Sequence, residues 1–120
     1  RPLYIYHNGT LTKVAADRMP IGGDLSADAP FTDHELPLCH GDMLYLFTDG
    51  IVDQFGFDSQ RNKEVKFSAR RLQALLSEIN ALPCSEQLKR IQSAIDDWRN
   101  VGTWRESEQT DDNLMVGIRL

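Results

Sequence analysis

Five consecutive apolar residues, Met43 to Phe47, constrain the fold of this chain more than any other feature of its sequence. The run has the length of a strand and carries no polar face, so the strand should be covered on both sides. Gly41 and Asp42 turn the chain into it. A chain of 120 residues holds one compact core at most, and this strand is predicted to lie within that core.

Turn signals and alternating apolar residues predict the other strands. Asn8-Gly9 can supply the two positive φ values that a tight type I′ hairpin requires. Residues 19–30 break regular structure and are predicted to form a surface loop. The predicted strands are residues 3–6 and 11–14 in the hairpin, 31–36 between Pro30 and Pro37, and 114–120 at the end, with Leu114, Val116 and Ile118 on one side.

Two helices are predicted before the last strand, each with an apolar stripe that faces the core. The first should end before Pro83, because proline cannot continue a helix. Ser85 should be the N-cap of the second, with Glu86 in its first turn. Strands followed by a helix pair and another strand indicate the α+β class. The stripes are Leu72, Leu75, Leu76, Ile79 and Leu82 in the first helix, and Leu88, Ile91, Ile95 and Trp98 in the second.

Charge and composition exclude several classes of protein. A net charge of −5 and a pI of about 5.1 argue against a nucleic-acid partner, because phosphate binding needs clustered Lys and Arg. No apolar run approaches the roughly 20 residues that span a membrane, so no membrane partner is expected. Two cysteines are too few for a disulfide framework, which favours a reducing cytoplasm. A zinc site is disfavoured without a paired CxxC motif; its candidate ligands would be Cys39, Cys84, His34 and His40.

The apolar run is followed directly by Asp49 and Gly50. Gly50 lets the backbone bend and approach a ligand closely. Asp49 is thereby held at the end of a rigid strand, which suits a hard cation that prefers oxygen ligands. An Asp-Gly pair after a strand is more often a plain turn, so this segment alone leaves both interpretations open.

Three oxygen-bearing side chains, Asp111, Asp112 and Asn113, precede the final strand. They could form a solvated turn. If the final strand pairs beside the apolar one, however, its leading carboxylates come near Asp49, and carboxylates held together favour protonation or a bound cation. Mg²⁺ or Mn²⁺ would resolve that conflict and lower the pKa of its bound water, producing a nucleophile for phosphate-ester hydrolysis.

Together these segments resemble the metal-dependent, type 2C-like protein phosphatases, and best the branch of sporulation stage II protein E and the sigma-factor-regulator phosphatases. The resemblance implies a sandwich of two antiparallel sheets with helices outside both. Residues 1–120 would supply the C-terminal portion of that single domain, a partial α-β-β-α sandwich with a helix pair. The matching segments are Pro20-Ile21-Gly22, Gly41-Asp42, Leu44 to Ile51 and Gln109 to Asp112.

The resemblance implies a role for each matching residue. Asp49 is a metal ligand and Asp111 another, with Asp112 as the alternative if the register shifts. Gly50 is the backbone hinge. Asp53 either contacts a metal-bound water or has a solvent-facing or capping role, the second being favoured. The family's remaining ligands lie on strands that precede this segment, so residues 1–120 alone are expected to lack a complete binuclear Mg²⁺ or Mn²⁺ centre and to be inactive.

The implied function is hydrolysis of phosphoserine or phosphothreonine in a partner protein, within bacterial signalling. No side chain would act as nucleophile, since metal-activated water attacks phosphorus. The alternative is a phosphatase-like module that binds a partner without turnover, and a third interpretation is an unrelated interaction domain. Without the preceding strands an apolar sheet face would be bare, so a homodimer through the side of residues 43–47 is expected.

Overall fold

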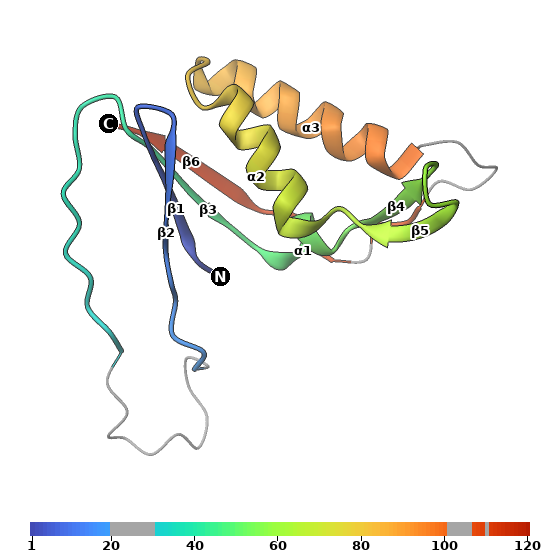
Figure 1. Cartoon of the computed structure of the whole chain (residues 1–120), viewed down its shortest axis with the longest axis horizontal. Helices are drawn as coiled ribbons and strands as arrows, with labels where there is room; N and C mark the ends of the chain where they lie inside the picture. The colour runs from blue at the N-terminus through green and yellow to red at the C-terminus, as the bar shows by residue number, and fades with distance from the viewer. Residues whose placement is uncertain (20–30, 101–106, 110) are drawn as a thin grey trace.

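A four-stranded antiparallel sheet lies beneath two helices, with a two-stranded hairpin beside them (Figure 1). The strand order in the sheet is β2 (Thr10–Val14), β1 (Leu3–His7), β3 (Met43–Phe47) and β6 (Met115–Arg119). The computed structural model describes residues 1–19, 31–100, 107–109 and 111–120. This arrangement confirms the predicted α+β class with an antiparallel sheet and a helix pair. The elements are β1 Leu3–His7, β2 Thr10–Val14, β3 Met43–Phe47, α1 Asp49–Asp53, β4 Phe55–Asp58, β5 Lys63–Lys66, α2 Ser68–Ile79, α3 Cys84–Asn100 and β6 Met115–Arg119.

The first hairpin forms as predicted. His7 pairs with Thr10, and the two residues between them, Asn8 and Gly9, have φ values of 47° and 77°. Positive φ at both positions is what a type I′ turn requires, and Asn-Gly meets it with little strain. The sequence therefore determines this turn locally.

The strand predicted over residues 31–36 is wrong, because those residues form no strand. All but one of their side chains are exposed, so an alternating pattern there has no core to face. Pro37 also removes a backbone donor at the end of the segment. Thr32 is held instead by the Asp17 carboxylate, which accepts its backbone N–H at 2.7 Å. The predicted loop at 19–30 lies, apart from Met19, outside the described residues.

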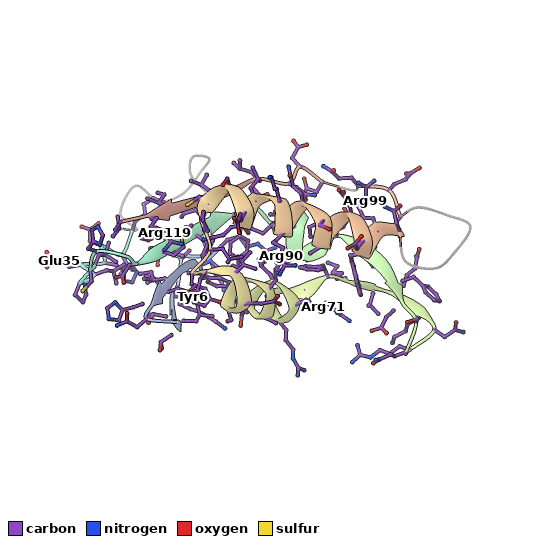
Figure 2. The ribbon with its side chains drawn as sticks, turned by 90° about the horizontal axis from the view of Figure 1, so that it is seen from above. Tyr6, Glu35, Arg71, Arg90, Arg99 and Arg119 are labelled. Atoms are coloured by element: carbon purple, nitrogen blue, oxygen red, sulfur yellow. The ribbon has the colours of Figure 1, made fainter. Side chains whose placement is uncertain are left out.

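One face of β3 is buried and the other is not. Tyr45 on the helix side is 1% exposed, whereas Leu46 on the opposite side is 47% exposed. The expectation that both faces would be covered is therefore wrong for these residues, because α2 and α3 lie on a single face of the sheet. Figure 2 shows the two helices side by side over the sheet.

The uncovered side of the sheet carries a group of apolar residues that we call the open face. Cross-strand register places its members opposite one another in pairs on β3 and β6. Leu46, Val116 and Ile118 are 47%, 42% and 43% exposed. The predicted alternation of the last strand is thus confirmed, but its apolar side faces outward. The open face consists of Leu44 opposite Ile118 and Leu46 opposite Val116.

The helix pair breaks at Pro83 as predicted, but the second helix differs in detail. It begins at Cys84, so Ser85 lies inside its first turn and is not the N-cap. The carbonyl of Pro83 accepts the backbone N–H groups of Glu86 and Gln87 instead. Leu88, predicted in the apolar stripe, is 56% exposed. Among the described residues, no helix combines the length and apolarity that a membrane crossing requires.

In the first part of α3, the amide of Gln87 is buried against the sheet, in place of the predicted Leu88. Its Oε1 accepts a hydrogen bond from the Tyr45 hydroxyl at 2.6 Å, and its Nε2 donates to the Leu82 carbonyl at 2.7 Å. Burial raises the pKa of Tyr45, so the phenol stays protonated and available as a donor. Arg119 at the end of β6 donates to the same Leu82 carbonyl. One polar cluster therefore ties two strands to the turn between the helices.

The β4–β5 hairpin has no counterpart in the sequence predictions. Its strands are short, and β5 is mostly exposed and charged, so neither has a clear apolar alternation. The hairpin is held from α3: the Trp98 indole N–H donates to the Gln54 carbonyl at 3.3 Å. A Cβ at Gly56 would lie 2.6 Å from the Trp98 ring. Arg71 also donates to the Asp58 carboxylate at 3.0 Å, so tertiary contacts with α2 and α3 give the hairpin its place.

Replacing Tyr45 by phenylalanine should destabilise the fold by about 1–3 kcal/mol, because Oε1 of the buried Gln87 loses its donor. Urea unfolding measures the change. The matched control is Tyr4→Phe. The Tyr4 hydroxyl accepts a hydrogen bond from the Gln73 amide, which is half-buried and can be reached by water when the hydroxyl is removed. Equal stability losses in the two variants would contradict the special role of the Gln87 contact.

We propose that the open face makes residues 1–120 self-associate. Exposed apolar side chains on paired strands favour burial against a second copy. Light scattering should show a mass that rises with protein concentration. The double variant Leu46→Glu with Val116→Lys should stay monomeric. Its two opposite charges face each other across the strand pair, so the variant should keep the β3–β6 pairing. Leu88→Lys, a change on the exposed side of α3, should leave association unchanged. A monomer at high concentration in the unmodified chain would refute the proposal.

Candidate functional site

Asp49 stands where β3 gives way to α1. Thr48 is extended, with φ −82° and ψ 167°, and the helix begins at Asp49. The Asp49 side chain is 56% exposed, whereas Gly50 and the two residues after it are buried. An acidic residue in the first turn is favoured by the helix dipole. The chain thus presents one carboxylate to solvent from a backbone anchored in the core.

Thr48 joins this turn to the segment that precedes β6. Its hydroxyl donates to the Asp112 carbonyl at 2.8 Å and accepts the Leu114 backbone N–H at 3.0 Å. The Thr48 backbone N–H donates in turn to the Leu114 carbonyl at 3.0 Å. Although Thr48 occupies the N-cap position of α1, its side chain caps no helical N–H. The hydroxyl is used instead to hold a strand entry that is distant in sequence.

Gly50 allows the two segments to touch. A Cβ at this position would lie 2.6 Å from both the Asp112 carbonyl oxygen and Asn113 Oδ1. Such distances are far below van der Waals contact, so any larger residue would push the segments apart. The glycine is therefore required by the close approach of the chain around Asp112. Its predicted close approach to a ligand stays a prediction.

The two acidic residues before β6 form their own local turn. The Asp112 backbone N–H donates to Asp111 Oδ1 at 2.8 Å, and Gln109 Nε2 donates to the Asp111 carbonyl at 2.9 Å. Both aspartates are exposed. The end of β3 and the start of β6 lie side by side, as expected. Among the described residues, however, Asp49, Asp111 and Asp112 do not form a group of three ligands close enough to hold one metal ion. A cation shared between them stays a prediction.

Basic side chains surround the acidic residues of α1. Arg1 approaches Asp49 Oδ2 to 3.1 Å, and Lys66 approaches Asp53 Oδ2 to 3.2 Å. Arg1 also lies 3.8 Å from Asp53. The hydrogen bond from Arg1 lowers the pKa of Asp49, and the ionised carboxylate is the form that binds a cation. Asp53 faces Lys66 at the far end of the helix.

The donor chemistry around Asp49 fits a hard divalent ion. Asp49 offers carboxylate oxygens, which suit Mg²⁺ and Mn²⁺, and Asp53 is a second carboxylate that shares the Arg1 guanidinium with it. A groove of about 430 Å³, lined in part by Arg1, Thr48, Asp49 and Leu114, opens beside the carboxylate. A cation could reach Asp49 from this groove, and it would take over the charge compensation that Arg1 provides here.

Comparison with known proteins identifies the family. The family model of stage II sporulation protein E matches residues 1–120. The chain belongs to the stage II sporulation protein E family. A solved structure with the same fold is the SiaA-PP2C domain of Pseudomonas aeruginosa, with a TM-score of 0.81 and 26% sequence identity. The match covers 99% of this chain and 43% of that chain. No curated protein matches the sequence at a significant level.

Membership of the stage II sporulation protein E family confirms the resemblance inferred from the sequence motifs. It also places the chain in a phosphatase family and removes the interpretation as an unrelated interaction domain. The chain spans less than half of the solved relative's length. The fold of the shared portion is therefore established, and the activity of a complete domain is a matter for proposal.

Three residues that shape this site had no predicted role. Thr48 lies inside the recognised motif but had no assigned role; a threonine directly before a helix suggests an N-cap, which is not its use here. Arg1 and Lys66 reach α1 through tertiary contacts, and no local pattern marks them. Long basic side chains on a surface give no signal of which carboxylate they will meet.

Replacing Thr48 by valine should free the chain before β6. The isosteric change removes both side-chain hydrogen bonds and should cost about 1–2 kcal/mol of stability. Hydrogen exchange of the Leu114 amide should accelerate by more than the loss of global unfolding free energy explains. Thr48→Ser keeps the hydroxyl and should preserve the slow exchange. If the valine and serine variants exchange alike, the hydroxyl does not hold this segment.

Proposed function

We propose that residues 1–120 form the C-terminal portion of a metal-dependent phosphatase domain that hydrolyses phosphoserine or phosphothreonine in a protein substrate. The observation that carries the proposal is the close joining of the Asp49 turn to the Asp111–Asp112 segment through Thr48 and Gly50. In a chain of this family and fold, that joining supports two acidic segments acting at one place.

In this proposal Asp49 and Asp111, with Asp112 as the alternative, hold Mg²⁺ or Mn²⁺. When bound, such an ion lowers the pKa of coordinated water and so supplies a nucleophile for a phosphate ester. The chain's own residues prepare the place: Thr48 holds the β6 entry, and Gly50 permits its approach. Arg1 compensates the charge of Asp49 through an ion pair at 3.1 Å.

The preceding part of the parent protein would complete this site. The solved relative is longer than the matched region, which leaves room for a second sheet and further ligands. The same part would cover the open face. Residues 1–120 alone should therefore show little or no turnover, whereas the parent should act on a phosphoprotein in bacterial cytoplasmic signalling.

One observation favours the alternative, a phosphatase-like module without turnover. The Arg1 guanidinium lies 3.1 Å from Asp49 and already provides the positive charge that a cation would bring. If that pair persists in the parent protein, the carboxylate would serve as a structural anion. A phosphatase should lose turnover when the Asp49 carboxylate is removed, whereas a module without turnover has none to lose.

The deciding experiment measures Mn²⁺-dependent hydrolysis of a phosphoserine peptide by the parent protein. Asp49→Asn should reduce turnover by at least about tenfold, since losing a ligand costs no less than losing an outer-shell partner of one. Asp111→Asn and Asp112→Asn, tested separately, identify which of the two is the ligand by the larger loss.

Asp33→Asn is the matched control, because Asp33 is an exposed carboxylate on the segment before β3. It should leave turnover unchanged. Turnover in Asp49→Asn equal to that of the unmodified parent would exclude a ligand role for Asp49. A folded parent that binds phosphopeptide but never hydrolyses it would establish the non-catalytic alternative.

A further inference from the structure

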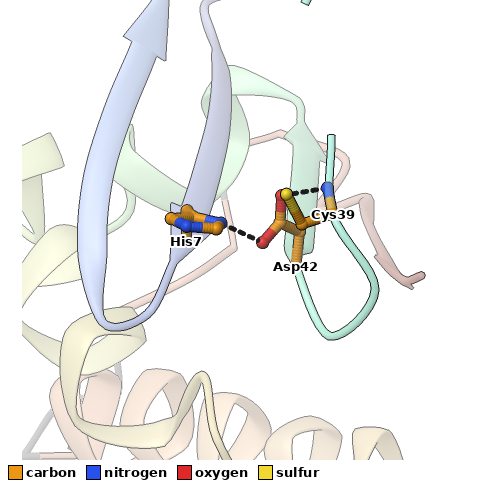
Figure 3. Close-up of side chains that lie close together, drawn as sticks. All are labelled: His7, Cys39 and Asp42. Carbon is orange, nitrogen blue, oxygen red and sulfur yellow. Dashed lines mark hydrogen bonds and ion pairs between the residues drawn. The ribbon is translucent and has the colours of Figure 1, made fainter. Parts of the chain in front are cut away.

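A second group of chemically active side chains lies at the other end of β3 from Asp49. His7 ends β1, Cys39 and Asp42 precede β3, and one ligand atom from each lies within 4.8 Å of the others (Figure 3). The five residues of β3 separate this group from the Asp49 turn by roughly 17 Å of strand. The group therefore belongs to neither the Asp49 turn nor its groove.

The backbone beneath this group is fixed before any ligand arrives. The Asp42 backbone N–H donates to the Cys39 carbonyl at 3.1 Å, and Gly41 between them has a φ of 95°. The same turn is bound to the end of β6: Gly41 donates to the Leu120 carbonyl at 2.8 Å, and Leu120 donates to the Asp42 carbonyl at 3.1 Å. Little conformational entropy would be lost here on binding.

The side chains combine a buried anchor with two accessible partners. The Asp42 side chain is 4% exposed, and its carboxylate accepts the Cys39 backbone N–H at 2.9 Å and His7 Nδ1 at 2.7 Å. The His7 side chain is 51% exposed and Cys39 is exposed. The other ring nitrogen of His7 contacts the exposed Asn8 amide at 3.1 Å. An ion from solvent can therefore reach the imidazole and the thiol.

We propose that His7, Cys39 and Asp42 form a binding site for Zn²⁺ or another divalent transition ion that accepts thiolate. Sulfur, imidazole nitrogen and carboxylate oxygen are the ligands zinc takes in proteins, and three protein ligands leave a fourth position for water. Tetrahedral bonds of about 2.0–2.3 Å place ligand atoms roughly 3.3–3.8 Å apart, so a shift of about 1 Å by the exposed side chains closes the site. Mg²⁺ does not compete, because it prefers oxygen ligands.

Binding exchanges protons for the metal in a balanced way. The Cys39 thiol releases its proton to solvent, and the ion takes the place of the proton between His7 Nδ1 and Asp42. The proton displaced from Nδ1 is replaced, through solvent, by one on Nε2, so the metal-bound imidazole is neutral. The result is a cross-link between the first hairpin and the turn before β3, which stabilises this end of the sheet.

The site differs from the zinc ligands considered in the sequence, Cys39, Cys84, His34 and His40, and shares only Cys39 with them. His7 comes from a hairpin far along the chain, and Asp42 was assigned only to a turn. The β1–β3 pairing, with Tyr6 opposite Met43, is what places these two side chains together. No spacing pattern in the sequence predicts such a site.

Co²⁺ serves as the probe, added to residues 1–120 kept reduced with a non-thiol reductant. One equivalent should produce a thiolate-to-Co²⁺ charge-transfer band and tetrahedral d–d bands, and Zn²⁺ should abolish both and raise the thermal midpoint. Excess Mg²⁺ should leave the bands unchanged, which separates this site from the one proposed for the phosphatase. The readout involves no turnover, so failure of either proposal leaves the other standing.

Two variants and a control decide the assignment. Cys39→Ser should remove the charge-transfer band, and His7→Gln should weaken Co²⁺ binding by more than about tenfold. Cys39 is exposed, so the thermal midpoint of Cys39→Ser without metal should stay near that of the unmodified chain. His7→Gln also loses the ring contact with the buried Asp42 carboxylate, so its midpoint without metal should fall modestly, and its Co²⁺ affinity is compared at a temperature where it is fully folded. Cys84→Ser removes the other exposed cysteine and should leave the bands intact. The absence of a thiolate band, or its loss in Cys84→Ser instead, would overturn the proposal.

Discussion

The pairing of β3 with β6 is the constraint on which the rest of this structure depends. Five antiparallel residue pairs, from Met43 opposite Arg119 to Phe47 opposite Met115, bring the last strand against the central one. At one end the pairing sets the chain before β6 against Thr48 and Gly50. At the other it fixes the turn before β3 through Leu120. Both candidate sites are therefore built at the ends of a single strand pair.

The two ends differ in chemistry because their side chains differ in hardness. The Asp49 end offers exposed carboxylates with a neighbouring guanidinium, an environment for a hard cation that keeps much of its water. The opposite end offers a thiol and an imidazole above the buried carboxylate of Asp42. Because Mg²⁺ and Zn²⁺ differ in their preferred ligands, the same strand pair can support two sites without competition.

One-sided burial explains the remaining features of the fold. The helices cover a face that carries three tyrosines, whose hydroxyls need partners once they are buried. Tyr45 finds Gln87, and this requirement turns an amide toward the sheet while Leu88 faces solvent. The opposite face keeps its apolar residues exposed, and an exposed apolar patch of this kind is typical of a surface that binds another partner.

Local chemistry was sufficient to predict the Asn8-Gly9 turn, the β3 strand and the helix break at Pro83, because each depends on backbone preferences or apolar runs of adjacent residues. The motif around Asp49, taken together with the Asp111-Asp112 pair before the last strand, was also sufficient to recognise the family. Only the tertiary structure decided which face of β3 is covered, where the β4–β5 hairpin lies, and that His7 meets Asp42. Those outcomes depend on contacts between residues distant in sequence, and no local pattern contains the register that brings such residues together.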